Sequence, residues 1–343
     1  MKVYVGMSGG VDSSLTAALL VEQGYDVTGV YMKNWSQDLP GMRCPWADDL
    51  ADAKRVAVQL GIDLKVYDFE QEYRDKVVQY MIEEYKAGRT PNPDIMCNQE
   101  VKFKLFLEAA LEDGADRIAT GHYARTEKGR LQLAKDANKD QTYFLYRVTG
   151  AALQKTLFPL GEFTKPQVRK MAEERGLYTA GKKDSQGICF VGQIGIREFL
   201  SEYVQTAPGA IIDKQTGKTV GTHDGAIFYT LGQRHGLDVG GGLPYYVVGK
   251  DMSQNIVYVS QNINDENIWR RQIELTSIHW ITSQPTPEQL KNLQVRIRHR
   301  APLVGATLDG SLLELTEAQR AITAGQSAVL YSGEECLGGG LVV

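Results

Sequence analysis

The sequence is poor in cysteine and has no long apolar run. Its 343 residues include only four cysteines, namely Cys44, Cys97, Cys189 and Cys336. Because they form no C-x-x-C pair and no histidine stands at zinc-finger spacing, a structural zinc site and a disulfide framework are both disfavoured. No apolar stretch approaches the ~20 residues of a membrane span, and the N-terminus lacks the pattern of a secretory signal. We therefore expect a cytoplasmic protein that does not contact membranes.

The sequence also lacks an excess of basic residues. Its 38 lysines and arginines are outweighed by 42 acidic residues, which gives a formal net charge of −4. This balance does not indicate a nucleic-acid-binding protein, but it does not exclude one, because binding requires only a local basic face. The length predicts two or three domains, and a hydrophobic content of 43% is enough to fill sizeable cores.

The N-terminal stretch, MKVYVGMSGGVDSSLTAALL, combines a strand, a glycine-rich turn and a helix. Residues 2–7 have the composition of a buried strand, and the helix is expected to begin near Ser13. At such a junction the backbone N–H groups and the helix dipole favour a bound anion, and glycines let a phosphate approach closely. Asp12 would suit a phosphate site only with a cation between them, so we expect it to contact Mg²⁺. The alternative is an ordinary strand–turn–helix unit with capping serines.

The string SGGVDS at residues 8–13 favours the phosphate site. It lacks the lysine of a Walker loop and the spacing of the dinucleotide fingerprint. It resembles the SGGxDS loop of the ATP pyrophosphatases, the PP-loop enzymes. That resemblance implies a loop that binds the β,γ-pyrophosphate of ATP and leaves the α-phosphate open to attack. The implied chemistry is adenylation with release of pyrophosphate.

Predicted strands and helices alternate over the first 122 residues. After the first strand and helix come strands at 27–32, 63–69 and 117–122, and helices at 47–60, 73–85 and 102–111. This alternation predicts an α/β domain with a doubly wound parallel sheet. Ligands of such sheets bind beyond the carboxyl ends of the strands. The glycine-rich loop, Met32, Gly121 and His122 should therefore share one rim.

Cys97 follows a segment whose two prolines and asparagine argue against regular structure, residues 89–96. We expect Cys97 near the start of a helix, where the helix dipole would lower the pKa of its thiol and make it a better nucleophile. The alternative is a half-buried cysteine in a stiff loop. Residues 181–190 change abruptly from polar to apolar around Cys189 and are expected to form a mobile loop.

A helix is predicted over residues 164–175, with Thr164 as its cap and Pro166 in its first turn. One basic cluster lies on it, made of Lys165, Arg169, Lys170 and Arg175.

Beyond about residue 205 short β-like runs replace helical periodicity. Runs at 209–213, 218–221, 226–231, 245–248 and 256–259 predict a small β domain, and runs at 274–281, 293–298, 305–308, 311–315, 328–331 and 337–342 predict a barrel or sandwich, with a loop at 285–287. Alternation would place Arg296, Arg298 and Arg300 on one face of a strand, as in a strand that tracks phosphates. A charged, solvated edge strand is the alternative.

Together the motifs resemble those of the tRNA-specific 2-thiouridylases over essentially the whole chain. The motifs are SGGVDSS, GRTPNPDIMCNQEVKF around Cys97, ATGHYAR around His122, NKDQTYFLY from Asn138, KKDSQGICF around Cys189, TLGQRHGL from Thr230 and a terminal LGGG. The resemblance implies a PP-loop catalytic domain over 1–204, which includes a basic tRNA-binding helical segment near 164–185. It also implies a small central β domain over 205–271 and a C-terminal β-barrel over 272–343.

The resemblance also implies a reaction. ATP and Mg²⁺ are used, the 2-oxygen of a flipped wobble uridine attacks the α-phosphate, and Cys189 carries a persulfide sulfur. Cys97 assists at the reacting carbon or resolves the persulfide through a transient Cys97–Cys189 disulfide, with Asp94 as acid or base. The implied ATP-binding residues are Gly6, Met7, Ser8, Gly9, Gly10, Val11, Asp12 and Ser13, with Met32 and Gly121 beside the adenosine.

The implied partners are tRNA and a sulfur-donor protein, either a persulfide carrier or a cysteine desulfurase, and we expect a monomer. The residues implied in tRNA contact are Asn92, Pro93, Asp94, His122, Lys139, Asp140, Gln141, Arg298, His299 and Gln326. Two alternatives remain at this point. One is an adenylating PP-loop enzyme that uses a nitrogen nucleophile, and the other is a nucleotide-gated RNA-binding protein without chemistry.

Overall fold

The computed structural model describes residues 1–38, 44–183, 195–240, 242–262, 265 and 268–343. Its N-terminal domain is built on a parallel sheet of five strands in the order β3-β2-β1-β4-β7. The strands are β1 (Lys2–Gly6), β2 (Asp26–Lys33), β3 (Asp63–Asp68), β4 (Arg117–Ala119) and β7 (Thr156–Leu157). The predicted α/β class is therefore confirmed. The strand order reverses beside β1, so the crevice at its carboxyl end is where such sheets bind ligands.

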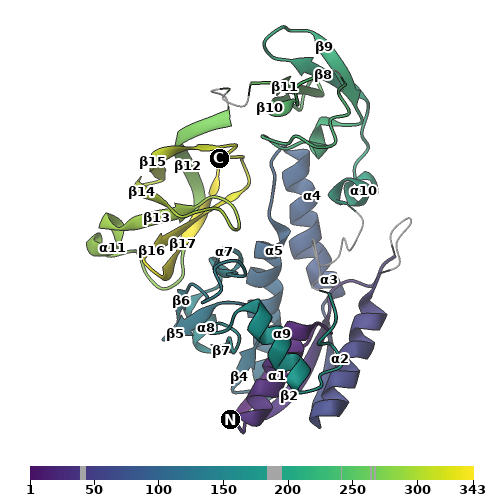
Figure 1. Ribbon diagram of the computed structural model, residues 1–343, viewed down its shortest axis with the longest axis vertical. Helices are drawn as coiled ribbons and strands as arrows, with labels where there is room; N and C mark the ends of the chain where they lie inside the picture. Colours follow the sequence, from purple (N-terminus) through teal and green to yellow (C-terminus); the bar gives the residue numbers. More distant parts are fainter. Residues whose placement is uncertain (39–43, 184–194, 241, 263–264, 266–267) are drawn as a thin grey trace.

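Helices α1 (Val11–Glu22) and α2 (Trp46–Leu60) follow the first two strands, as the pattern predicted. The helix predicted over 73–85 is a longer unit that consists of α3 (Glu70–Tyr73), a π-helical stretch (Arg74–Val78) and α4 (Gln79–Lys86). In Figure 1, α4 rises from this domain toward the green domain at the top of the molecule. Among the described residues, we find no helix with the length and apolarity required to cross a bilayer.

Residues 89–92 have no regular structure, as predicted, but residues 93–96 are helical, so the prediction was wrong for the second half of the segment before Cys97. One continuous helix runs through α5 (Pro93–Met96), a π-helical stretch (Cys97–Leu105) and α6 (Phe106–Glu112). Pro93 occupies the first helical position, where its missing N–H costs nothing, and the Asn92 side chain caps the helix. The predicted helix at 102–111 is therefore the second half of this unit.

The rest of the N-terminal domain consists of short elements. A hairpin of β5 (Arg125–Glu127) and β6 (Arg130–Gln132) precedes α7 (Thr142–Leu145) and α8 (Gly150–Gln154), and α9 (Lys165–Glu174) and α10 (Ile196–Ser201) come later. Helix α9 packs on α1 through a shared apolar cluster that includes Leu15 and Val168. This packing brings Lys165, at the start of α9, to Asp12 at the start of α1, whereas Arg175 pairs with Glu22 at the end of α1.

The middle region is a small mixed sheet with its own core. Its strands are β8 (Gly209–Asp213), β9 (Thr219–His223), β10 (Tyr246–Asp251) and β11 (Ile256–Ser260), in the order β10-β11-β8-β9. The run predicted as a strand at 226–231 begins instead with a 3₁₀ turn at Ala226–Phe228. Ala226 and Ile227 are buried in this turn, so their apolar character did not distinguish a turn from a strand.

The C-terminal region is a closed barrel of antiparallel strands, as predicted. Around the barrel run β12 (Trp269–Trp280), β15 (Leu312–Arg320), β14 (Val304–Asp309), β13 (Leu293–Arg296), β16 (Ser327–Ser332) and β17 (Glu335–Val342), and β17 pairs back onto β12. The expected loop near Pro287 contains a short helix, α11 (Pro287–Lys291). The β5–β6 hairpin of the N-terminal domain also pairs with β17, which joins the barrel to that domain (Figure 1).

Candidate nucleotide and cysteine sites

The glycine-rich loop is held by contacts that leave no room for side chains. Gly9 has a φ of +71°, and a Cβ there would lie 2.4 Å from the backbone oxygen of Asp49 at the start of α2. A Cβ on Gly121 would lie 2.9 Å from the backbone carbon of Asp12. The structure thus brings the loop after β1 and the residues after β4 into contact, on the rim that the sequence predicted.

The serines of the loop stabilise its backbone rather than capping α1. Ser13 Oγ accepts a hydrogen bond from the N–H of Ser8 at 3.1 Å, and the hydroxyls of Ser13 and Ser14 donate to the carbonyl of Gly10. The N-cap of α1 is Gly10, which makes no side-chain capping bond. The first turn of α1 therefore keeps the N–H groups and positive dipole that attract an anion.

Asp12 is the acidic side chain of this loop, and it lies in an ion pair. Lys165 Nζ is 2.7 Å and 2.9 Å from its two carboxylate oxygens, and the Tyr123 hydroxyl donates to one of them at 2.9 Å. The described residues contain no group of three or more acidic, histidine or cysteine side chains able to hold a metal ion by themselves. A single carboxylate suits Mg²⁺, which is usually held by one or two carboxylates together with phosphates.

Lys165 is a site residue that the sequence reasoning did not single out from its basic cluster. It begins α9, where a capping box formed by Thr164 and Gln167 fixes the helix start. Its backbone N–H donates to Asp136 at 2.8 Å, and its side chain is only 10% exposed. Because Asp12 is 153 residues away in sequence, no local pattern could pair the two.

Met32 lies beside the same loop. A Cβ on Gly6, the last residue of β1, would be 3.0 Å from the Cε of Met32 at the end of β2. The backbone N–H of Met7 donates to the carbonyl of Val30 at 2.8 Å, which continues the pairing of β1 and β2 up to the turn. Gly6, Met7 and Met32 therefore share the rim with the loop residues 8–13.

Asn92, Pro93 and Asp94 form the first turn of the helix that carries Cys97. Asn92 Oδ1 accepts a hydrogen bond from the N–H of Asp94 at 3.2 Å. Cys97 begins the π-helical stretch one turn later and lies in the core of the domain, with 2% of its surface exposed. The thiol therefore lies one turn into the helix, and it is buried.

Asp94 and His122 both lie within the electrostatic influence of Lys102. Burial raises the pKa of Asp94, and the positive charge of Lys102 opposes that rise. Burial lowers the pKa of His122 well below its usual value, and Lys102 lowers it further. His122 Nδ1 lies 2.8 Å from the hydroxyl oxygen of Thr120, and its ring is 5.5 Å from that of Phe103. Lys102 is a second residue that the sequence reasoning missed. Asp94 lies earlier on the same helix, but His122 comes from the segment after β4.

Cys189 lies outside the described residues, so its predicted pairing with Cys97 stays a prediction. The chain leading to it is fixed beside the nucleotide loop. Lys182 Nζ lies 2.8 Å from Asp49 and 2.7 Å from Asp52, both on α2. Asp49 is also the residue whose backbone touches Gly9. Cys44, Cys97 and Cys336 are all buried.

Two of the residues predicted to contact tRNA, Asp140 and His299, lie at the seam between the N-terminal domain and the barrel. Asp140 is buried there, and its carboxylate accepts hydrogen bonds from the Ala134 N–H, the Thr142 hydroxyl and Arg296 at 2.7–2.9 Å. Gln141 accepts from the N–H of Tyr123 through its side-chain oxygen at 2.9 Å. Lys139 and Gln326 are both half-buried. The carboxylate of Asp140 is therefore engaged by the protein itself.

The strand predicted over residues 293–298 is present but shorter, and the prediction that Arg296, Arg298 and Arg300 share one of its faces was wrong. Strand β13 ends at Arg296, and Arg298 and Arg300 lie in the bend and turn that follow, so the three side chains do not share a strand face. Arg296 points to Asp140, and Arg300 donates to the carbonyl of Asn138 at 3.1 Å. The alternating pattern suggested a face that contacts phosphates, but Arg296 instead forms an internal ion pair.

His299 packs in the same seam. Its ring lies 4.5 Å from that of Phe144, and burial lowers the pKa of His299 to about 4, aided by the charges of Arg300, Arg296 and Lys139. Arg298 donates to the carbonyl of Ala321. The neutral imidazole is therefore an aromatic surface flanked by cations.

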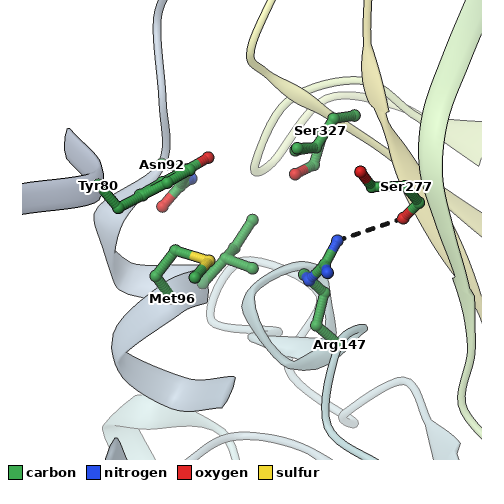
Figure 2. A pocket seen from close by; sticks show the side chains of 8 residues that line it. Tyr80, Asn92, Met96, Arg147, Ser277 and Ser327 are labelled. Atoms are coloured by element: carbon green, nitrogen blue, oxygen red, sulfur yellow. Dashed lines mark hydrogen bonds between the residues drawn. The ribbon is translucent and has the colours of Figure 1, made fainter. Parts of the chain in front are cut away.

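A cavity of about 180 Å³ lies between α5 and the barrel (Figure 2). Its lining residues are Tyr80, Asn92, Ile95, Met96, Arg147, Ser277, Ser327 and Leu341. Arg147 donates to the carbonyl of Ser277 at 3.3 Å across the base of this space. Asn92 is the one predicted site residue in the lining, and Arg147 is a charged group there that the sequence reasoning missed.

Comparison with known proteins adds family models over three consecutive parts of the chain. They are a tRNA methyl transferase HUP domain over residues 1–193, a tRNA methyl transferase PRC-barrel domain over 197–261 and an aminomethyltransferase beta-barrel domain over 270–342. The chain is 48% identical to tRNA-specific 2-thiouridylase MnmA 2 of Geobacillus kaustophilus (strain HTA426), over 99% of this chain and 94% of that protein. It is 47% identical to tRNA-specific 2-thiouridylase MnmA of Streptococcus sanguinis (strain SK36), over 100% and 95%.

Solved structures give a weaker likeness. A 4-thiouridine synthetase in complex with RNA and bound ATP aligns over 59% of this chain and 50% of that chain. The TM-score is 0.40 and the sequence identity is 19%. A likeness at this level assigns no role to any residue.

Proposed function

The chain belongs to the tRNA-specific 2-thiouridylase family, and we propose that it replaces the 2-oxygen of a tRNA wobble uridine with sulfur at the expense of ATP. The observation that carries the proposal is the rim beyond β1 and β4. There a glycine loop at a helix N-terminus adjoins the residues after β4, which include His122, and the pKa shifts of His122 and Asp94 both respond to Lys102. A phosphate-binding loop and a titratable acid on neighbouring elements suit adenylation of a nucleobase.

ATP fits the loop for physical reasons. Gly9 and Gly121 let the loop pack against the backbones of Asp49 and Asp12, where a Cβ would collide, and the first turn of α1 directs N–H groups outward. Asp12 would hold Mg²⁺ between itself and the phosphates, and the metal would screen the charge of the pyrophosphate leaving group. The residues that bind ATP are proposed to be 6–13, with Met32 and Gly121 at the adenosine.

The chemistry has two steps. The uridine 2-oxygen attacks the α-phosphorus, so that the bond to the β-phosphate breaks and pyrophosphate leaves. A sulfur nucleophile then attacks C2 and AMP leaves with the original oxygen. A thiolate or persulfide is the soft nucleophile that this step requires. Cys189 is proposed to carry the persulfide, and Cys97 either assists at C2 or resolves the persulfide by forming a disulfide with Cys189.

Asp94 is proposed as the acid or base of the reaction. Its raised pKa means that it retains a proton at a higher pH than an ordinary aspartate does. If Asp94 acts as the acid, the rate should fall as the pH rises through that pKa, and Asp94→Asn should abolish this limb of the profile. Lys102→Met should move the limb to higher pH, because the lysine charge lowers the pKa of Asp94. An unmoved limb would exclude Asp94 as its source.

The tRNA is proposed to lie along the seam where Lys139, Gln141 and His299 meet. Arg298 and Gln326 extend this surface on the barrel, and Asn92 and Pro93 border the cavity side that faces the target base. A sulfur-donor protein supplies the persulfide. We propose that the protein works as a monomer in the cytoplasm.

Reconstitution tests the function. Unmodified tRNA, ATP, Mg²⁺ and a persulfide donor should yield 2-thiouridine, AMP and pyrophosphate, detected by mass spectrometry of tRNA digests and by a pyrophosphate assay. Cys97→Ala and Cys189→Ala should each give no 2-thiouridine, whereas the matched control Cys44→Ala should retain it. Normal thiolation by the Cys189 variant would reject the persulfide role. Unchanged ATP turnover in a variant lacking both Cys97 and Cys189, with ammonia as nucleophile, would favour a nitrogen-transferring enzyme.

A further inference from the structure

The phosphate site contains a negative side chain but no positive one of its own. Residues 6–13 include Asp12 and no lysine or arginine. A triphosphate placed at the start of α1 would meet the carboxylate at short range, and like charges repel strongly in a partly desolvated site. A loop of this composition needs a cation from another part of the chain.

Lys165 supplies that cation from α9. Its ammonium lies within 3 Å of both oxygens of Asp12, and 5.9 Å from the centre of the Tyr123 ring. The lysine side chain is 10% exposed, whereas that of Asp12 is 31% exposed. The carboxylate of Asp12 offsets the cost of burying the ammonium group, because the two charges lie within hydrogen-bond distance. The ammonium therefore adds a positive charge at the helix N-terminus where a phosphate would bind.

The lysine is held in this place by its backbone as well as by its side chain. The capping box of Thr164 and Gln167 fixes the start of α9, and the Lys165 N–H bonds to the buried Asp136. The apolar face of α9 packs on α1 through Val168 and neighbouring residues. The ammonium is thus preorganised against the loop, so a ligand need not bring it into position.

We propose that Lys165 is a phosphate-binding residue that contacts the β,γ-pyrophosphate of ATP, while Asp12 engages Mg²⁺. The inference rests on the proposed use of ATP and adds a ligand residue to that site. With both side chains present the protein contributes no net charge to the site. Without Lys165, the uncompensated charge of Asp12 would oppose an anionic metal–pyrophosphate complex. The alternative is that Lys165 only neutralises Asp12 and never contacts phosphate.

Titration calorimetry with inorganic pyrophosphate and Mg²⁺ separates these roles without requiring catalysis. The variants are Lys165→Met, Asp12→Asn, the double variant of both, and Lys170→Met as a matched control. Lys170 lies on the same helix but pairs with Glu174 at the surface, with 76% of its side chain exposed. We expect Lys165→Met to weaken pyrophosphate binding at least tenfold and Lys170→Met to leave it unchanged.

The double variant is decisive. If Lys165 contacts phosphate, Asp12→Asn with Lys165→Met should bind pyrophosphate at least fivefold more weakly than Asp12→Asn alone. Equal affinity of these two variants would overturn the inference, since no charge then remains for the lysine to neutralise. The double variant replaces an ion pair by two neutral side chains of similar size, so it keeps the test valid even if Lys165→Met alone fails to fold. Absence of ATP and pyrophosphate binding in the unmodified protein would instead overturn the proposed use of ATP.

Discussion

Two long-range ion pairs join distant parts of this chain, and they differ in what their acids can still bind. Lys165 and Asp12 meet at the nucleotide loop across 153 residues, and Arg296 and Asp140 meet at the barrel seam across 156. The cations are equally buried, with 10% and 11% of their side chains exposed. The acids are not, since Asp12 is 31% exposed and Asp140 only 2%.

Hydrogen bonding separates the two pairs further. Asp140 accepts from a backbone N–H, a hydroxyl and a guanidinium, and Arg296 also lies over the ring of Tyr331. Asp12 accepts from Lys165 and Tyr123 and faces the crevice of the parallel sheet. A buried pair whose acceptors are occupied fixes the structure, whereas a pair with an accessible carboxylate can engage a ligand. The difference distinguishes a structural pair from a functional one without any knowledge of the reaction.

The largest effect is expected from breaking the seam pair. Arg296→Met should lower the free energy of unfolding by about 3–5 kcal/mol, because the carboxylate of Asp140 is left buried without its counter-ion. Chemical denaturation followed by tryptophan fluorescence measures the change. Arg300→Met is the control, since Arg300 is exposed and bonds only to a backbone carbonyl in the described part of the chain. A loss below 1 kcal/mol for Arg296→Met would contradict a structural role for the pair.

A smaller loss of stability is expected from the pair at the loop. Lys165→Met should cost about 1–2 kcal/mol, because Asp12 is partly exposed to water and keeps its bond to Tyr123. The same denaturation experiment gives the value, and it should be well below that of Arg296→Met. If Lys165→Met were less stable than Arg296→Met, the exposed fraction of the acidic partner would not distinguish a functional ion pair from a structural one.

The pH dependence of stability sharpens the description of the seam. The pKa of His299 is lowered to about 4 by burial and by neighbouring cations, so the folded state disfavours the imidazolium. The unfolded chain takes up a proton near pH 6.5, and stability contributed by the neutral ring is therefore lost as the pH falls from about 6.5 to 4.

The loss should amount to about 1–2 kcal/mol for a ring that is half-buried. Thermal melts at pH 7.5 and pH 5 measure it, and His299→Tyr should reduce the difference because tyrosine does not titrate in this range. An equal pH dependence in this variant would show that another group is responsible.

The smallest effect is expected at the anchor of the segment that leads to Cys189. Lys182→Ala should lower the free energy of unfolding by less than about 1 kcal/mol, because its pairs with Asp49 and Asp52 are partly exposed to solvent and screened. If Lys182 positions this segment beside the loop, the rate of thiolation should fall clearly even though the free energy of unfolding hardly changes. Lys183→Ala serves as the control, and equal thiolation by both variants would exclude a positioning role for Lys182.

Local chemistry explains most of what could be predicted. The glycine loop, the first three strands and the barrel were readable because turn residues and hydrophobic periodicity act over a few positions. The helix start at Pro93 was missed although Asn92 and Pro93 are a good capping pair, because the prolines were taken as breakers. The role of Arg296 was predicted wrongly because an alternating pattern shows which residues share a face of a strand. It does not show what packs against that face.

The sequence by itself determined the family, the α/β and barrel architecture and the place of the phosphate loop, since each depends on neighbours along the chain. Tertiary structure alone decided that Lys165 meets Asp12, that Lys102 influences His122, and that Arg296 faces inward. The packing of α9 on α1 brings Lys165 to Asp12, and the contact between the barrel and the N-terminal domain brings Arg296 to Asp140. The charge of a side chain does not indicate which distant residue it will meet, so only the fold could assign these pairs.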